Sequence, residues 1–176
     1  LCLLPFEPGE LTRLGGPPGL FVGHRLASDP DIARAAALQA APSTGDPDRT
    51  GEPDPIRRLL VLPGSRRSEV RHLCDPFGDT MARLRDRGHR LAIAIPTVPH
   101  VAPLVRQATA GWAEAPEIIL DPQRKWQAFG EADAALIASG TVSLELALSG
   151  VPFVSCYKAD RIMMTLRSLI KVWSAC

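Results

Sequence analysis

The 176-residue sequence predicts an α/β domain built on a doubly wound parallel sheet of the Rossmann-like kind. Five short runs that are apolar throughout recur after residue 55, and helix-compatible segments separate them. Strands of this kind are typical of parallel sheets, because helices cover both faces of such a sheet. Ligands bind beyond the carboxyl ends of the strands in these folds, so the loops after the five runs are where function is expected.

The first 55 residues do not follow this alternation. We expect a buried strand at 1–6 (LCLLPF) and a second short strand with a turn at 19–26 (GLFVGHRL). Residues 28–55 are rich in Ala, Pro, Asp and Gly, which predicts a flexible insertion. Within it, 32–41 is compatible with a helix and 42–55 is typical of a mobile linker.

From residue 56 onward, predicted strands and helices alternate. The predicted strands are 58–63, 90–96, 117–120, 133–138 and 152–157. The predicted helices are a long one ending near 87, then 98–110, 123–132, 141–150 and 161–173. The last helix carries an apolar stripe beside Arg161, Arg167 and Lys171, which fits core packing and also fits contact with a membrane surface.

The composition is that of a soluble globular protein, with 45% hydrophobic and 22% charged residues. The formal net charge of +1 gives no general attraction to nucleic acid, so any anion site must be local. The four cysteines form no CxxC pair, which argues against zinc and disulfides and favours reduced thiols in a cytosolic protein. No apolar run approaches the roughly 18 residues that span a bilayer.

The loop after the first predicted strand carries two arginines in an unexpected place. The stretch LVLPGSRRSEV at 60–70 puts Arg66 and Arg67 where a helix begins, and a helix N-terminus disfavours cations unless an anion lies in front of it. Gly64 permits a tight turn and close ligand approach, Ser65 can donate a hydrogen bond or cap the helix, and Arg66 can pair with phosphate. An ordinary Gly-Ser turn with two solvated arginines is the alternative.

The loop after the fourth predicted strand has the same character. Ser139, Gly140 and Thr141 are small or hydroxyl-bearing and begin a helix, an arrangement that binds phosphate readily. Glu145 lies one turn further along an otherwise apolar helix, so we expect a buried carboxylate with partners. It suits hydrogen bonding to ribose hydroxyls, and a structural ion pair with a Lys or Arg is the alternative.

Two loops suited to phosphate and one candidate ribose carboxylate together indicate a nucleoside diphosphate. The sequence has neither the GxGxxG dinucleotide fingerprint nor a GxxxxGK[ST] loop, which favours a sugar nucleotide over NAD or ATP. Asp121-Pro122-Gln123 follows the third predicted strand and is expected near the base through backbone groups. His100 shows no metal-ligand spacing and is expected at the surface.

Five segments of the chain together resemble the lipid-A-disaccharide synthase family, glycosyltransferases with the two-domain B architecture. The segments are LPFEP (4–8), FVGH (21–24), LLVLPGSRRSEV (59–70), ASGTVSLELALSGVPFVSCYK (138–158) and SLIKV (168–172). The resemblance implies that the chain contains the nucleotide-binding half of such an enzyme. It also implies that Gly64, Ser65 and Arg66 form one phosphate loop, that Ser139, Gly140 and Thr141 form the second, and that Glu145 binds the ribose.

The resemblance implies a reaction as well. The family transfers 2,3-diacylglucosamine from its UDP donor to 2,3-diacylglucosamine 1-phosphate, with inversion, which forms the β-1,6-linked precursor of lipid A. No metal or other cofactor is expected in the sugar-nucleotide site. The expected location is the cytoplasm of a Gram-negative bacterium, with peripheral contact at the inner face of the inner membrane, where lipopolysaccharide synthesis begins.

The resemblance also divides the chain. Residues 1–27 correspond to the end of an N-terminal domain and the connection between domains, 28–55 to the insertion, and 56–176 to a nucleotide-binding domain that is incomplete at its C-terminus. The general base and the acceptor site are expected in an N-terminal domain outside this sequence, so the chain alone is expected to be inactive. Arg25 departs from the family pattern, which usually has Pro after Gly-His.

Two alternatives stay open from the sequence. One is an isomerase similar to UDP-N-acetylglucosamine 2-epimerase, which shares the architecture. That family is expected to show Gly-Gly and paired glutamates near the second loop, whereas Glu145 is followed by Leu146. The other is a nucleotide-binding fragment without catalytic activity.

Overall fold

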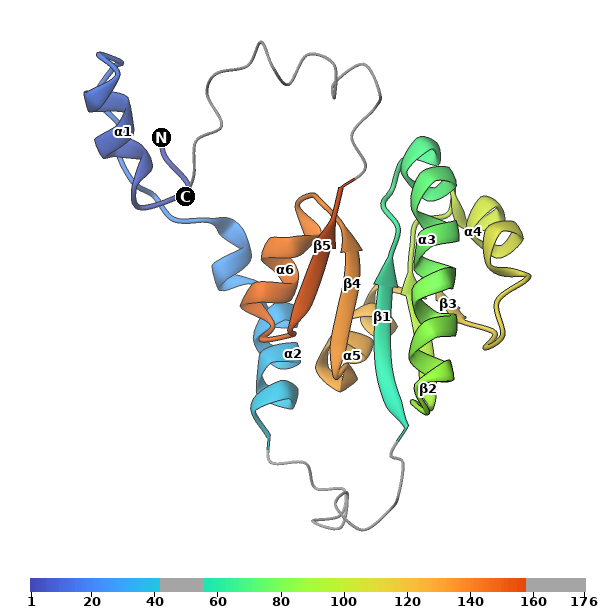
Figure 1. The fold of residues 1–176 in the computed structure, drawn as a ribbon. Coiled ribbons are helices and arrows are strands. Elements are labelled where there is room, and N and C mark those ends of the chain that lie inside the picture. Colours follow the sequence, from blue (N-terminus) through green and yellow to red (C-terminus); the bar gives the residue numbers. More distant parts are fainter. Residues whose placement is uncertain (42–55, 158–176) are drawn as a thin grey trace.

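A computed structural model describes residues 1–41 and 56–157. Its centre is a five-stranded parallel sheet with the strand order β3-β2-β1-β4-β5 (Figure 1). From β1 in the middle of the sheet, the chain moves outward through β2 to β3 and then returns to add β4 and β5 on the other side. This is the order of a doubly wound Rossmann-like sheet, so the predicted fold class is confirmed.

The strands and helices after residue 56 follow the predicted alternation as far as the described residues extend. The strands are β1 Arg57–Leu62, β2 Leu91–Pro96, β3 Glu117–Ile119, β4 Ala134–Ala138 and β5 Phe153–Cys156. The helices of this part are α3 Arg67–Asp86, α4 Ala102–Thr109, α5 Pro122–Glu131 and α6 Val142–Leu148. The predicted helix at 161–173 lies outside the described residues.

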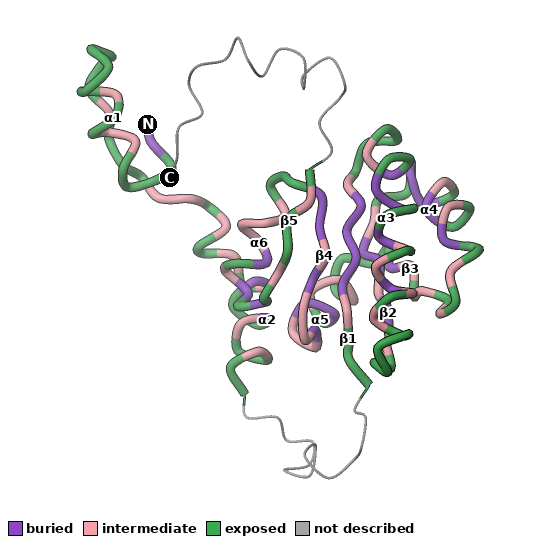
Figure 2. The backbone as a smooth tube through the Cα atoms, viewed as in Figure 1, coloured by how far each residue is buried: buried purple, intermediate pink, exposed green. Residues whose placement is uncertain are grey.

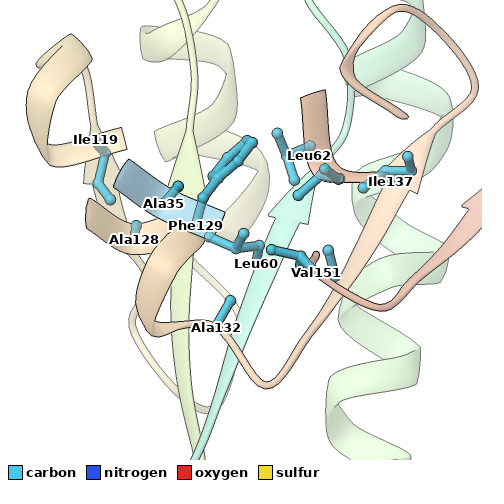
Figure 3. Packing of buried hydrophobic residues seen from close by; sticks show 11 residues of the cluster. Ala35, Leu60, Leu62, Ile119, Ala128, Phe129, Ala132, Ile137 and Val151 are labelled. Carbon is cyan, nitrogen blue, oxygen red and sulfur yellow. The ribbon is translucent and has the colours of Figure 1, made fainter. Parts of the chain in front are cut away.

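Side chains of β1 alternate between two cores, one on each face of the sheet. Leu60 and Leu62 pack with Phe129 of α5 in one cluster, which Figure 3 shows. Val61 packs in the other cluster with residues of α3 and α4, including Phe77. Buried residues therefore concentrate on the central strands β1 and β4 (Figure 2), as expected for a sheet covered on both faces.

The first half of the predicted insertion is a packed helix. This helix, α2 (Pro30–Ala40), buries Ile32 and Ala35 against the domain. The side-chain amide of Gln39 donates to the carbonyl oxygens of Phe129 (2.8 Å) and Ala132 (2.7 Å), which lie at the C-terminal end of α5. The expectation of a flexible insertion across 28–55 is therefore corrected for this part, because burial and capping fix it. Residues 42–55 lie outside the described residues.

The same capping chemistry begins α2 and α5. The side chain of Asp29 accepts from the N–H of Asp31 at 2.9 Å, and that of Asp121 accepts from the N–H of Arg124 at 2.7 Å. In both helices a proline follows the capping residue, where its missing N–H costs nothing. Asp121 therefore fixes the point at which α5 begins, at the carboxyl edge of the sheet.

The strand predicted at 1–6 is wrong. Only Cys2 is buried, and it forms an isolated parallel bridge with Phe21. The N–H groups of Leu3 and Leu4 instead donate to the carboxylate of Glu7, at 2.6 and 2.7 Å, and so turn the chain into a helix. This helix, α1 (Glu7–Arg13), lies apart from the sheet in Figure 1.

The segment predicted at 19–26 as a strand and turn is reduced to that bridge and a short 3-10 helix. This helix, η1 (Arg25–Ser28), is capped by His24, whose ring nitrogen Nδ1 accepts a hydrogen bond from the N–H of Leu26 at 3.2 Å.

In the described part of the chain, no helix has both the length and the apolar character that crossing a membrane requires.

Candidate functional site

A cavity of about 820 Å³ lies at the carboxyl edge of the sheet. The last residues of β1, β2, β3 and β4 line it: Leu62, Pro96, Ile119 and Ala138. This is the edge at which parallel α/β sheets bind ligands, and the volume is in the range of small-molecule sites. All seven residues predicted from the sequence line this cavity: Gly64, Ser65, Arg66, Ser139, Gly140, Thr141 and Glu145.

The first loop depends on Gly64. Its backbone φ angle of +103° is one that residues other than glycine rarely adopt. A Cβ at this position would also overlap the side chain of Glu69, which folds back against the loop. The loop is held from a second side, because His100 Nε2 lies 2.9 Å from the carbonyl oxygen of Ser65. His100 is exposed, as predicted, but it also positions the loop.

Arg66 precedes the first residue of α3 and pairs with a glutamate of the same helix. The N–H of Arg66 donates to Glu69 Oε2 at 3.1 Å, and its guanidinium Nη1 lies 3.1 Å from Glu69 Oε1. The Arg66 side chain is 80% exposed and the Glu69 side chain 26% exposed. Glu69 thus supplies one anion that offsets the cation at this helix start, a contribution that the sequence interpretation assigned to a ligand alone.

The second loop is a tight turn of small residues. The N–H of Ser139 donates to the carbonyl oxygen of Cys156 at 3.0 Å, which ties the loop to the end of β5. The carbonyl oxygen of Gly140 accepts from both the hydroxyl (2.6 Å) and the N–H (3.1 Å) of Ser143. Ser139, Gly140 and Thr141 are all exposed and line the cavity, so a ligand in the cavity can reach this loop.

Glu145 lies on the cavity wall and forms an ion pair. Its Oε2 is 2.6 Å from Nζ of Lys125, on α5. The Glu145 side chain is 22% exposed, so the expectation of a buried carboxylate is corrected to a partly buried one that borders the cavity. The structure therefore shows the ion pair that was the alternative interpretation, together with a position that leaves Glu145 accessible to a ligand.

Sequence reasoning missed Lys125, Glu69 and the contact of His100. Glu69 had a local signal, because it lies three residues after Arg66 at a helix start. Lys125 had none, because it lies twenty residues from Glu145 on another helix.

The cavity also has an apolar wall. Val98, Leu120 and Pro122 are among its lining residues, and Val98 and Leu120 are exposed large hydrophobic residues. Asp121 lies on the same wall, but its carboxylate caps α5. A cavity lined by both charged and apolar residues suits a ligand with an anionic part and a flat, weakly polar part. Among residues 1–41 and 56–157, no three His, Cys, Asp or Glu side chains gather as a metal site.

The sequence is similar to proteins of one family. The family model for lipid-A-disaccharide synthetase matches residues 1–173. The chain is 48% identical over 167 residues to the lipid-A-disaccharide synthase of Rhodopseudomonas palustris, covering 92% of this chain and 39% of that protein. It is 44% identical over 175 residues to the synthase of Bradyrhizobium diazoefficiens, covering 99% of this chain and 42% of that protein.

The chain thus spans about two fifths of the length of these curated relatives. Among solved structures it resembles the UDP-GlcNAc 2-epimerase of Methanocaldococcus jannaschii, with a TM-score of 0.49 and 16% identity over 84% of this chain and 42% of that one. This likeness is too remote to bear on function.

Proposed function

The chain belongs to the lipid-A-disaccharide synthetase family, and we propose that it is the part of such a glycosyltransferase that binds the UDP-sugar donor. One observation carries the proposal. The seven residues that the family motifs single out come from two loops and a helix separated by about seventy residues of sequence, and they line one cavity at the ligand-binding edge of the sheet.

The proposed donor places its diphosphate at the first loop. The N–H groups of the first turn of α3 lack partners within the helix, and the helix dipole favours an anion there. Arg66 is largely exposed, so it can leave Glu69 and make charge-assisted hydrogen bonds to the diphosphate. The hydroxyls of Ser139 and Thr141 lie on the same cavity as further donors.

The proposed nucleoside lies between Glu145 and the apolar wall. Glu145 accepts hydrogen bonds from the ribose hydroxyls, and the uracil packs against Leu120 and Pro122, where the backbone around Asp121 supplies polar groups for its edge. This placement uses the charged and the apolar sides of the cavity together.

In the proposed reaction, a hydroxyl of 2,3-diacylglucosamine 1-phosphate attacks the anomeric carbon of UDP-2,3-diacylglucosamine. The bond from that carbon to the diphosphate oxygen breaks with inversion, UDP leaves, and a general base takes the hydroxyl proton. Arg66 and the start of α3 stabilise the charge that develops on the departing diphosphate. The base and the acceptor site are expected in the part of the relatives that this chain does not span.

We also propose the domain assignment made from the sequence. Residues 1–27 would connect to the acceptor-binding domain, which fits the exposed apolar side chains of this segment, including Phe6, Leu20 and Phe21. The acylated substrates support a peripheral position at the inner face of the inner membrane. The helix predicted at 161–173, with its apolar stripe beside basic residues, lies outside the described residues.

Nucleotide selectivity tests the proposed function. Isothermal titration of the 176-residue chain should give one site for UDP, weaker binding of UMP because one phosphate is lost, and weaker binding of ADP because the proposed base contacts are made to the edge of uracil. The chain alone should not turn over UDP-2,3-diacylglucosamine. Equal affinity for UDP and ADP, or no saturable binding of UDP by a folded chain, would contradict the donor-site assignment.

A further inference from the structure

Lys125 has an unusual setting for a lysine at a cavity. It lies on α5, its Nζ is 2.6 Å from Glu145 Oε2 on α6, and both side chains are about three-quarters buried, at 26% and 22% exposure. Both line the cavity. The pair therefore links two helices across one wall of the site, and neither partner is a solvated surface charge.

Aromatic side chains fix Lys125 from the other side. Its Nζ lies 4.2 Å from the ring centroid of Trp126 and 5.3 Å from that of Phe129. The two rings pack edge to face, with centroids 5.3 Å apart and an interplanar angle of 76°, and Phe129 is fully buried in the core. The ammonium group is thus attached to the rigid part of the domain by cation–π contacts as well as by its ion pair.

This arrangement restricts Glu145 before any ligand binds. Lys125 engages Oε2, while a carboxylate has acceptor positions on both oxygens. A side chain that is already held loses less rotamer freedom when it accepts hydrogen bonds from a ligand. The ammonium is correspondingly less available to a phosphate, because it already has a carboxylate partner and two aromatic neighbours.

We propose that Lys125 is a positioning residue: it holds the carboxylate of Glu145 in the orientation that accepts the ribose hydroxyls, and it does not itself bind the diphosphate. The inference rests on the proposed function, in which Glu145 binds the ribose. Lys125 lies outside the sequence motifs that predicted the site. The inference assigns it to recognition of the ribose hydroxyls and not of the diphosphate.

The test compares UDP with 2′,3′-dideoxy-UDP, which keeps the diphosphate and the base but has no ribose hydroxyls. Titrations use the parent chain, Lys125→Met and the matched control Arg124→Met. Arg124 is the neighbouring cation on α5, and it pairs with Glu117 and Glu131 outside the cavity. The parent should prefer UDP about tenfold, as expected for hydrogen bonds to a charged group.

Lys125→Met should lower this preference to about threefold or less while the affinity for dideoxy-UDP changes little. Arg124→Met should keep the preference of the parent even if its melting temperature falls. Adding Lys125→Met to Glu145→Gln should leave the preference where Glu145→Gln alone puts it, because both changes remove one function.

Two results would overturn the inference. One is an unchanged preference in Lys125→Met, and the other is an equal loss of affinity for both ligands, which would place Lys125 on the phosphates or the base. If Lys125→Met does not fold, Lys125→Gln is titrated in its place, and the same results would support or overturn the inference. Failure of the proposed function looks different, because the parent chain itself would then bind no UDP or show no preference for the ribose hydroxyls.

Discussion

Two ion pairs on the same cavity differ in almost every physical respect. Arg66–Glu69 joins residues three apart at one helix start, at 3.1 Å, with the arginine 80% exposed. Lys125–Glu145 joins two helices across twenty residues of sequence, at 2.6 Å, with both side chains largely buried and the ammonium seated on aromatic rings. The first pair is local and its arginine is solvated, whereas the second is non-local and both of its side chains are about three-quarters buried.

The difference indicates two roles in one site. An exposed pair contributes little to stability, so its arginine can exchange one anion for another at small cost. A shielded pair is costly to break, because each partner would keep an unpaired charge away from water. We therefore expect the first pair to open for the diphosphate and the second to persist while it orients the ribose.

The largest effect should come from replacing Gly64, against which the Glu69 side chain packs. Gly64→Ala places a Cβ against the Glu69 side chain at a φ of +103°. Strain and overlap together should cost about 2–4 kcal/mol of stability and displace the first loop. Urea unfolding and UDP titration measure the two effects. Gly140→Ala, where a Cβ meets open space, is the matched control; equal stability losses in both variants would refute this account of the loop.

Replacing Arg66 or Arg67 shows whether a specific contact with the diphosphate, or positive charge in general, contributes to UDP binding. Arg66→Ala should weaken UDP binding by about 1.5–3 kcal/mol, the range for hydrogen bonds to charged groups. Arg67→Ala removes the same charge one residue further on, where the side chain does not line the cavity, and should have a smaller effect. Isothermal titration of both variants decides the matter, and equal losses would mean that charge alone, and not the position of Arg66, attracts the nucleotide.

Glutamate replacement compares the two pairs directly. Glu145→Gln should lower the free energy of unfolding by about 1–3 kcal/mol, because it leaves the shielded Lys125 without its carboxylate. Glu69→Gln should cost about 1 kcal/mol or less, because Arg66 remains solvated. Urea denaturation of the two variants provides the measurement. If Glu69→Gln proves the more destabilising, the ranking of the pairs is wrong.

The smallest effect concerns the support of the first loop. His100→Ala removes the contact with the carbonyl oxygen of Ser65 and should weaken UDP binding by about 0.5–1 kcal/mol, the net value of one hydrogen bond. His89→Ala, an exposed histidine outside the cavity, is the control for titration. A loss as large as that of Arg66→Ala would show that His100 contacts the ligand itself.

The sequence predicted those features that depend on local pattern. The uniformly apolar strands predicted the parallel sheet. The motif residues at the strand ends predicted the lining of the cavity, because the carboxyl ends of parallel strands meet at one edge of the sheet. Glu69 was within reach of the same reasoning, since a glutamate three residues into a helix commonly turns back to its start.

Features that depend on tertiary contacts could not be predicted in this way. Lys125 and Glu145 meet only because α5 and α6 pack on the same face of the sheet. The prediction of a strand at 1–6 failed because the apolar residues alone do not reveal that the Glu7 carboxylate accepts hydrogen bonds from the N–H groups of Leu3 and Leu4. The helix within 28–55 was visible as a pattern, but its packing on α5 through Gln39 was not.

The most direct test of the account is a crystal structure of the chain with UDP bound. The account predicts the diphosphate at the start of α3 within hydrogen-bonding distance of Arg66, with the guanidinium moved away from Glu69. It predicts the ribose hydroxyls on Glu145 while the Lys125–Glu145 pair stays intact. UDP bound outside this cavity, or bound here with Arg66 still on Glu69 and the Lys125–Glu145 pair broken, would contradict it.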